Sequence, residues 1–459
     1  MPNMFAYAML LVWPLVALFL YKKYPILEAT FWTIVGGYLL LPQGVDIDYP
    51  LIPALDKNTI PAISAFLGCR YIANKKVKFL PSPSIERNLM LLFVFGLTMT
   101  VIKNGDPIEE VNRFIPGLTY YDLFSVILSK YLLLLPFILG LQLVKTREDQ
   151  IRFLSLLVIS GLYYSLLALV EIRLSPQLHN WIYGFFPHTW GQQLRYGGFR
   201  PVVFLGHGLW VSIFLTMVLG AALTLSKAKL KVTRFSNTHI IFYLIIVLVL
   251  SKGFGSIILA GVLFFSLKLL ADKLSLKVAL LIAITAMTYP MMSVLGVFPH
   301  ESLVDLIMAV DAKQAGSLQF RFNQEGWLLD RAMERLWFGW GVWGRNRLID
   351  SVIDGYWIGL IGMYGVIGFI SIFGLMFVSV WKAGLCFKLI TEQKEKVLLV
   401  GHLLMCALIM LDQIPNHSEN PLFWLLFGGL IGRQRYIKES IDQVSDQPAG
   451  LPKTTIAGN

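Results

Sequence analysis

The stretch that decides the fold runs from Tyr356 to Trp381, and its sequence is YWIGLIGMYGVIGFISIFGLMFVSVW. It carries no charged side chain, and as an α-helix it is long enough to cross the roughly 30 Å core of a bilayer. Similar apolar runs recur along the chain. Hydrophobic residues occupy 56% of the 459 positions and charged residues 15%, whereas a soluble protein has about 25% charged residues. The sequence therefore predicts an all-α, polytopic membrane protein.

We expect about 12–13 membrane spans, which form a single transmembrane bundle over residues 1–436. The first span follows a short polar start without a basic region or a cleavage site, so we expect it to remain in the mature protein. The remainder, 437–459, is polar with Gly and Pro and is predicted to be a disordered tail. The spans are expected near 4–20, 26–42, 59–72, 88–103, 121–143, 151–172, 202–225, 238–252, 254–270, 278–296, 356–381, 397–412 and 420–432.

The loops alternate in lysine and arginine content. By the positive-inside rule the basic loops are cytoplasmic, which places the N-terminus in the periplasm and the C-terminus in the cytoplasm. The formal charge of +11 then reports topology and requires no nucleic-acid partner. The cysteines, Cys69, Cys386 and Cys406, have neither a disulfide pattern nor metal-ligand spacing. The remaining loops face outward, and the longest of these are 173–200 and 297–355.

The first long outer loop leads into an apolar run through RYGGFRPVVFLGHG, residues 195–208. We expect Pro201 at the first helical position, Arg200 beside the positive helix end, and His207 one to two turns deeper on the same face. An anion-binding entrance with a titratable group behind it is one interpretation. The alternative is that Arg195 and Arg200 contact lipid headgroups while His207 makes an interhelical hydrogen bond.

The second long outer loop carries more arginine than outer loops normally hold, although residues 297–354 contain six basic and eight acidic side chains. We expect an amphipathic helix over 317–338 that lies across the end of the bundle. Within it Arg331 and Glu334 are spaced to pair. Arg321 has only Glu325 nearby, so it is the better candidate to bind an anion. The remaining arginines of this loop are Arg335, Arg345 and Arg347.

Three further features of the outer loops allow more than one interpretation. Lys252 lies between two short apolar runs beside a glycine, where lysine can bind an anion or snorkel to the interface. Asp354 precedes the run at 356–381, where it can cap the helix or act as a general base. The tryptophans at 337, 340 and 343 suit an interfacial belt or, less well, sugar stacking. The glycines around them match a dinucleotide fingerprint, but no strand precedes them.

Several polar residues remain open to a structural or a functional interpretation. Asp46 and Asp48 form a pair that could hold a divalent metal for glycosyl transfer. Glu171 and Arg173 are expected to pair locally. The polar residues inside spans are expected to face the bundle interior or a cavity, with packing as the default; they are Lys130, His402 and Asp412.

Three motifs occur in a fixed order over roughly residues 150–432. They are Arg195 to Pro201 with Gly206; Ser251-Lys252-Gly253; and Arg321 followed by 337–344, Asp354-Gly-Tyr-Trp and the Gly-rich run 362–368. In this order the chain resembles the O-antigen ligase and polymerase superfamily of bacterial inner-membrane glycosyltransferases. The family has an Arg…Gly-Phe segment, a Ser-Arg-Gly turn, and a large outer loop followed by a Gly-rich helix at the corresponding places.

The resemblance implies a metal-independent enzyme without a cofactor in the bacterial inner membrane. Its substrates would be an undecaprenyl-diphosphate-linked glycan and an acceptor glycan or glycolipid, used for lipopolysaccharide or exopolysaccharide biosynthesis. Diphosphate binding is then assigned to Arg195, Arg200, Lys252 and Arg321, and catalysis to Arg321, Asp354 and His207. Lys252 replaces the arginine usual in the family. Asp354 replaces the histidine that ligases carry, which resembles the polymerase branch.

Two rival functions remain on the sequence alone. The ligase branch would transfer glycan to lipid A core instead of extending a lipid-linked chain. A transporter of lipid-linked glycans or small anions would concentrate charge near the middle of the membrane and contain broken helices. This chain gathers its unusual residues in outer loops, which favours chemistry at the membrane surface. The sugar, the linkage and the oligomeric state do not follow from the sequence.

Overall fold

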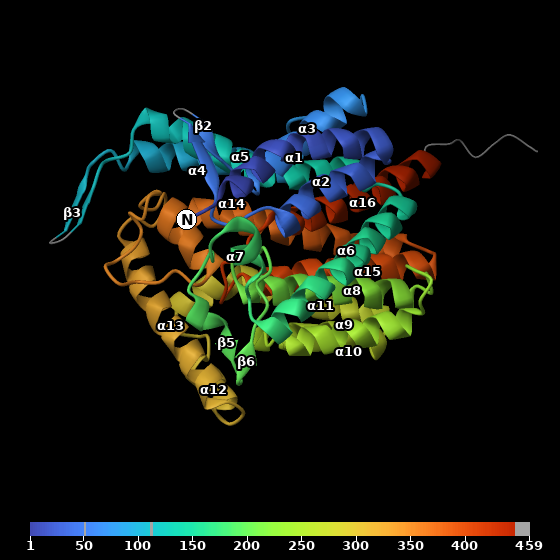
Figure 1. The fold of residues 1–459 in the computed structure, drawn as a ribbon. Helices are drawn as coiled ribbons and strands as arrows, with labels where there is room; N and C mark the ends of the chain where they lie inside the picture. Colours follow the sequence, from blue (N-terminus) through green and yellow to red (C-terminus); the bar gives the residue numbers. More distant parts are fainter. Residues whose placement is uncertain (50–51, 111–112, 446–459) are drawn as a thin grey trace, which may run out of the picture.

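A computed structural model describes residues 1–49, 52–110 and 113–445. The protein is a bundle of roughly parallel and antiparallel helices, and Figure 1 shows irregular loops, hairpins and the helices α7, α12 and α13 gathered at one end of it. The N-terminus lies at that same end. The all-α fold class is confirmed.

Every predicted span coincides with a helix. Among the described residues, seven helices are long and apolar enough to cross a membrane: α1 (Met4–Lys23), α4 (Ile85–Ile102), α5 (Tyr120–Leu143), α6 (Arg147–Leu174), α8 (Gly208–Lys227), α11 (Asp272–Val294) and α14 (Tyr356–Cys386) with its 3-10 extension to Leu389. This content identifies a membrane protein, while the number of spans and their orientation stay predictions. Shorter or more polar helices fill the other predicted positions: α2 (Ile26–Leu40), α3 (Thr59–Leu67) with a π-helical turn to Ile72, α9 (Asn237–Leu250), α10 (Phe254–Lys268), α15 (Gln393–Asp412) and α16 (Pro421–Ser445).

Glycines allow the central helices to approach closely. A side-chain carbon on Gly140 of α5 would lie 2.6 Å from the carbonyl oxygen of Leu425 on α16, and one on Gly428 would meet the backbone of Phe137. The helices α5 and α16 therefore pack backbone against backbone, as small residues permit in membranes. Dispersion attraction between the closely packed backbones stabilises this contact, and no hydrophobic effect is required.

Helix α14 is kinked at Gly365, and the kink anchors the large outer loop. Gly365 has φ +67°, and a side-chain carbon there would lie 2.2 Å from the backbone of Trp337. The kink frees the Val366 amide from the helix, and this amide donates to the carbonyl of Leu336 over 2.8 Å. Glycine is required here because other residues rarely adopt this backbone conformation. The sequence singled out the Gly-rich run but not the docking of loop onto helix.

The loops hold more order than the sequence predicted. Among the described residues, three two-stranded antiparallel hairpins form in loops that are predicted to face outward: β1 (Asp46–Tyr49) with β2 (Ile52–Asp56), β3 (Ile108–Glu110) with β4 (Arg113–Ile115), and β5 (Leu194–Arg195) with β6 (Gly198–Phe199). The amphipathic helix begins earlier than expected and follows a shorter one, as α12 (His300–Met308) and α13 (Ala312–Met333).

The predicted C-terminal tail is corrected in part, because α16 continues to Ser445. Residues 437–445 are therefore helical and not disordered. The rest of the predicted tail, 446–459, lies outside the described residues.

Candidate functional site

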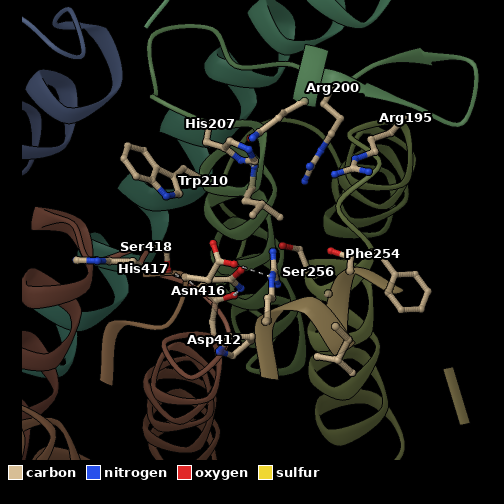
Figure 2. Close-up of a pocket in the computed structure, with 18 of the residues that line it drawn as sticks. Arg195, Arg200, His207, Trp210, Phe254, Ser256, Asp412, Asn416, His417 and Ser418 are labelled. Carbon is tan, nitrogen blue, oxygen red and sulfur yellow. Dashed lines mark hydrogen bonds and ion pairs between the residues drawn. The ribbon is translucent and has the colours of Figure 1, made fainter. Parts of the chain in front are cut away.

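A cavity of about 710 Å³ opens at the loop end of the bundle (Figure 2), and we call it the main cavity. Its walls come from the loop before α8, the turn between α9 and α10, helix α13, the segment before α14 and the loop after α15. All six residues to which the resemblance assigns a role line it: Arg195, Arg200, His207, Lys252, Arg321 and Asp354. Their roles remain predictions, but their proximity is a property of the fold.

Arg195 is presented by the β5–β6 hairpin. Tyr196 and Gly197 both have positive φ, at 50° and 66°, which is the signature of a two-residue type I′ hairpin turn. The Tyr196 hydroxyl donates to the carboxylate of Asp311 over 2.6 Å. Asp311 is the N-cap of α13, so the hairpin is latched to the start of the helix that carries Arg321.

Lys252 stabilises this hairpin. Its ammonium donates to the carbonyl oxygen of Arg195 over 2.9 Å. A side-chain carbon on Gly198 would lie 2.2 Å from that ammonium, so the glycine provides the space that the lysine occupies. Lys252 therefore contributes positive charge to the main cavity and also positions Arg195.

Arg200 is the most deeply buried cation of the main cavity, with 3% of its surface exposed. No carboxylate pairs with it anywhere in the described residues, and its Nε has no hydrogen-bond partner there. Burial, and then the positive charges of Arg195 and Arg321, lower the pKa of Arg200 to about 10. The guanidinium thus stays charged at neutral pH while it lacks a counter-ion.

The path of the chain between Arg200 and α8 differs from the sequence prediction. Pro201 does not begin the helix; α8 begins at Gly208, and His207 is its N-cap. His207 therefore does not lie one to two turns inside the helix. Arg200 still lies beside the helix end, because a side-chain carbon on Gly208 would meet Arg200 Cβ at 3.0 Å. The free amides of that end favour an anion at this place.

The imidazole of His207 is neutral and already uses one nitrogen. Its Nδ1 accepts a hydrogen bond from the Leu209 amide over 3.0 Å, so the neutral ring carries its proton on Nε2. Burial, followed by the charge of Arg200, lowers the pKa of His207 to about 3. In this state His207 can donate a hydrogen bond but is a poor proton acceptor.

A buried carboxylate prevents α8 from starting earlier. The Glu171 carboxylate accepts the backbone amides of Val202 and Val203, each over 2.7 Å, and that of Leu178 over 2.9 Å. The expected Glu171–Arg173 pair is therefore wrong, because these amides occupy the carboxylate. Lys57, also buried, donates to the carbonyl of Phe204 over 2.8 Å. The two buried charges fix the loop that presents Arg200 and His207.

Arg321 and Asp354 lie next to each other in the wall of the main cavity. The Arg321 Nε lies 3.7 Å from an Asp354 carboxylate oxygen, and both side chains are partly exposed. Gln324 on α13 brings the two segments together, since its side-chain oxygen accepts the Val352 amide over 2.8 Å. Gly355, and not Asp354, is the N-cap of α14. The helix-capping interpretation of Asp354 is therefore wrong.

Three other arginines of the large loop, Arg331, Arg335 and Arg345, are structural. Arg345 is fully buried and donates to the carbonyls of Trp340, Pro116 and Asp106 over 3.1, 2.7 and 2.8 Å. Arg335 pairs with Asp106 over 2.8 Å, and Arg331 with Glu334 over 3.0 Å as predicted.

The tryptophans of the large loop do not line the main cavity. Trp340 is held between the guanidinium groups of Arg331 and Arg335, which lie 3.5 and 4.3 Å from the ring centre. Trp337 and Trp343 are exposed. The geometry therefore does not support sugar stacking on these rings.

Asp412, which we expected to face the bundle interior or a cavity, lines the main cavity. Its carboxylate accepts from Asn416 over 2.8 Å and from Ser418 over 2.5 Å. Sequence reasoning missed Trp210 and His417, which also line the main cavity. Trp210 lies inside an apolar run and so carried no signal that separates it from packing residues.

Other candidates lie elsewhere. Asp46 and Asp48 are exposed on β1 and do not line the main cavity. His402 is buried against the carbonyl of Leu426, 3.0 Å from its Nε2. The ammonium of Lys130 lies 5.6 Å from the ring centre of Tyr364. His402 therefore follows the packing alternative, while Lys130 lines a second, mostly apolar cavity.

The main cavity carries four cations, Arg195, Arg200, Lys252 and Arg321, against two carboxylates, Asp354 and Asp412. With His207 neutral, the excess charge is positive, and the most buried cation, Arg200, has no counter-ion within the part of the chain that the structure describes. Guanidinium and ammonium groups pair well with phosphate oxygens. The fold and site define a membrane protein with a positively charged cavity at one end. No family model matches this chain, and a search of curated proteins gave no significant match.

Proposed function

We propose that this protein is an inner-membrane glycosyltransferase that acts on undecaprenyl-diphosphate-linked glycans at the periplasmic face. The observation that carries the proposal is Arg200, a buried guanidinium at the N-terminal end of α8 for which the described residues provide no counter-ion. A protein maintains such a charge at a cost in stability, which a bound diphosphate would offset. Arg195 and Arg321 line the same cavity and can bind further phosphate oxygens.

In the proposed reaction the acceptor hydroxyl oxygen attacks the anomeric carbon of the glycan. The bond between that carbon and the diphosphate oxygen breaks, and undecaprenyl diphosphate leaves with its electron pair. The guanidinium groups of Arg195, Arg200 and Arg321 stabilise the negative charge that develops on the leaving group. The hydroxyl proton passes to a base.

Asp354 is the better candidate for this base than His207. Its carboxylate is partly exposed in the main cavity and its contact with Arg321 is long, at 3.7 Å. A weakly held carboxylate can accept a proton. His207 already uses Nδ1 for the Leu209 amide, so it is assigned to hydrogen-bond donation through Nε2.

Polymerisation of lipid-linked repeat units is the preferred activity, because an acid at position 354 resembles the polymerase branch. Ligation to lipid A core is the alternative within the same chemistry. Transport is less well supported, because the cations lie under loops at one end of the bundle and a transporter places its site near the membrane midplane.

The test compares Arg321→Ala with Lys313→Ala in proteoliposomes supplied with a defined undecaprenyl-diphosphate oligosaccharide. Both changes remove one positive charge from α13, but Lys313 is exposed and does not line the main cavity. We expect transfer to fall at least tenfold in Arg321→Ala, the loss of one charge-assisted contact of about 1.5 kcal/mol or more, and to persist in Lys313→Ala. Equal activity of the two variants would contradict the assignment of Arg321.

Addition of EDTA to the same assay separates the two mechanisms of leaving-group stabilisation. If the arginines carry this role, wild-type transfer persists in EDTA. Loss of transfer in EDTA, with recovery on adding a divalent metal, would show a metal-dependent transferase instead.

A further inference from the structure

The lining of the main cavity is of two chemical kinds. Its apolar lining comes from Phe254, Ile258, Ile307, Leu318 and Phe320. Its lining also combines an indole with amides and imidazoles, from Gln43, His188, Gln192, Trp210 and His417. Figure 2 shows Phe254 at one side of the view and Trp210 with His417 at the opposite side, with Arg200 between them and Arg195 above Phe254.

The Trp210 ring occupies space that is open only because residue 206 is glycine. Trp210 is the third residue of α8, and a side-chain carbon on Gly206 would lie 2.7 Å from its ring and 3.0 Å from Gln43 Cγ. Gly206 has an ordinary negative φ, since it is not among the residues of positive φ. The glycine is therefore needed for the space that Trp210 and Gln43 occupy, and not for its backbone conformation.

Hydrogen-bonding groups surround this indole. His207 lies between Trp210 and the arginines in Figure 2, and its Nε2 proton is free to be donated because Nδ1 is the acceptor for Leu209. The His188 ring lies 4.9 Å from the His207 ring, edge to face. Amides and neutral imidazoles donate and accept hydrogen bonds, while an indole offers a flat apolar surface. A pyranose ring needs this combination, since it has apolar C–H faces and hydroxyl groups at its edge.

We propose that the Trp210–Gln43 end of the main cavity binds the sugar that is attached to the diphosphate. The inference rests on the proposed function and adds a sugar subsite to it. A prenyl-diphosphate sugar is apolar, then anionic, then a polyol along its length. Across Figure 2 the main cavity presents Phe254, then Arg200, then Trp210 with His417, which is the same order.

The test measures binding to purified protein in detergent by native mass spectrometry. The probes are undecaprenyl diphosphate and its glucose, galactose and N-acetylglucosamine derivatives. We expect at least one glycosylated lipid to bind wild type more tightly than undecaprenyl diphosphate does. Trp210→Leu should remove most of this preference, about 5- to 10-fold in affinity, without changing the affinity for undecaprenyl diphosphate. Trp210→Phe should retain part of the preference.

Gly206→Ala is a second variant with the same expected result, because the added carbon displaces the Trp210 ring. Unchanged binding of undecaprenyl diphosphate shows that a variant has kept its fold.

Three results would overturn the sugar subsite alone: no sugar preference in wild type, the same preference in Trp210→Leu as in wild type, or an equal weakening of all four lipids in that variant. Failure of wild type to bind any of the four lipids would overturn the proposed function as well.

Discussion

Replacement of Arg200 by methionine is expected to stabilise the protein while it weakens diphosphate binding. Arg200 is 3% exposed, and its Nε has no partner within the described residues. Burial of an ion without a partner costs several kcal/mol, and apolar side chains of similar volume often replace buried ions with a gain of about 1–4 kcal/mol. Methionine matches the unbranched shape of the arginine stem. We therefore expect a higher apparent Tm for Arg200→Met in detergent without ligand.

Arg345→Met is the matched control. Arg345 is also buried, but its guanidinium donates to three backbone carbonyls. Each buried acceptor left without a donor costs about 1–3 kcal/mol, so the loss is at least about 3 kcal/mol. Replacement of a buried arginine by methionine should thus raise the apparent Tm at position 200 and lower it at position 345.

The second half of the experiment titrates inorganic pyrophosphate. Loss of charge-assisted hydrogen bonds worth about 1.5–3 kcal/mol weakens binding about 10- to 150-fold in Arg200→Met. A fall in the Tm of Arg200→Met comparable to that of Arg345→Met would refute the reasoning, since it would show that Arg200 has structural partners. Unchanged pyrophosphate affinity would refute it equally.

Three other substitutions test how the fold builds the site. Glu171→Gln should lower the free energy of unfolding by about 3–5 kcal/mol, because the carboxylate binds three amides. Arg173→Gln should have little effect. Equal destabilisation of the two variants in thermal unfolding would indicate that Glu171 and Arg173 pair after all. Gly365→Ala should prevent accumulation of folded protein, because its φ is +67° and the added carbon meets the backbone. Gly261→Ala, with open space around it, should stay within about 1 kcal/mol of wild type in stability. Comparable yields of the two variants on size-exclusion chromatography would contradict this prediction. Stability of wild type should fall as pH drops below about 6.5, because the unfolded His207 gains a proton that the folded state, with a pKa of about 3, does not. His207→Asn, which can still cap α8, should remove part of this pH dependence, and an unchanged profile would show that His207 does not contribute to it.

Length and hydropathy were sufficient to predict the helices, because a bilayer requires long apolar segments whatever their partners. The start of α8 was not predictable in this way. It moved from the expected position near 202 to Gly208 because Glu171, distant in sequence, takes the amides of Val202 and Val203. A local sequence pattern holds no information on such a contact.

The arginines show the same limit at the site. Arg321 and Arg345 belong to one loop and cannot be distinguished by residue type. One faces the main cavity, and the other is occupied by carbonyls of the loop near Pro116. The isolation of Arg321 from acidic neighbours in the sequence was the useful signal. Trp210 had no such signal, because an apolar run hides a tryptophan that lines a cavity.

The central claim is that the main cavity transfers a glycan from undecaprenyl diphosphate, and its most direct measurement is the product analysis of wild-type proteoliposomes supplied with one defined lipid-linked oligosaccharide. Mass spectrometry should detect lengthened lipid-linked glycan together with free undecaprenyl diphosphate, one molecule released for each unit transferred. Transfer to added lipid A core would retain the chemistry and change the acceptor. Intact substrate that has only crossed the bilayer, with no undecaprenyl diphosphate released, would contradict the claim.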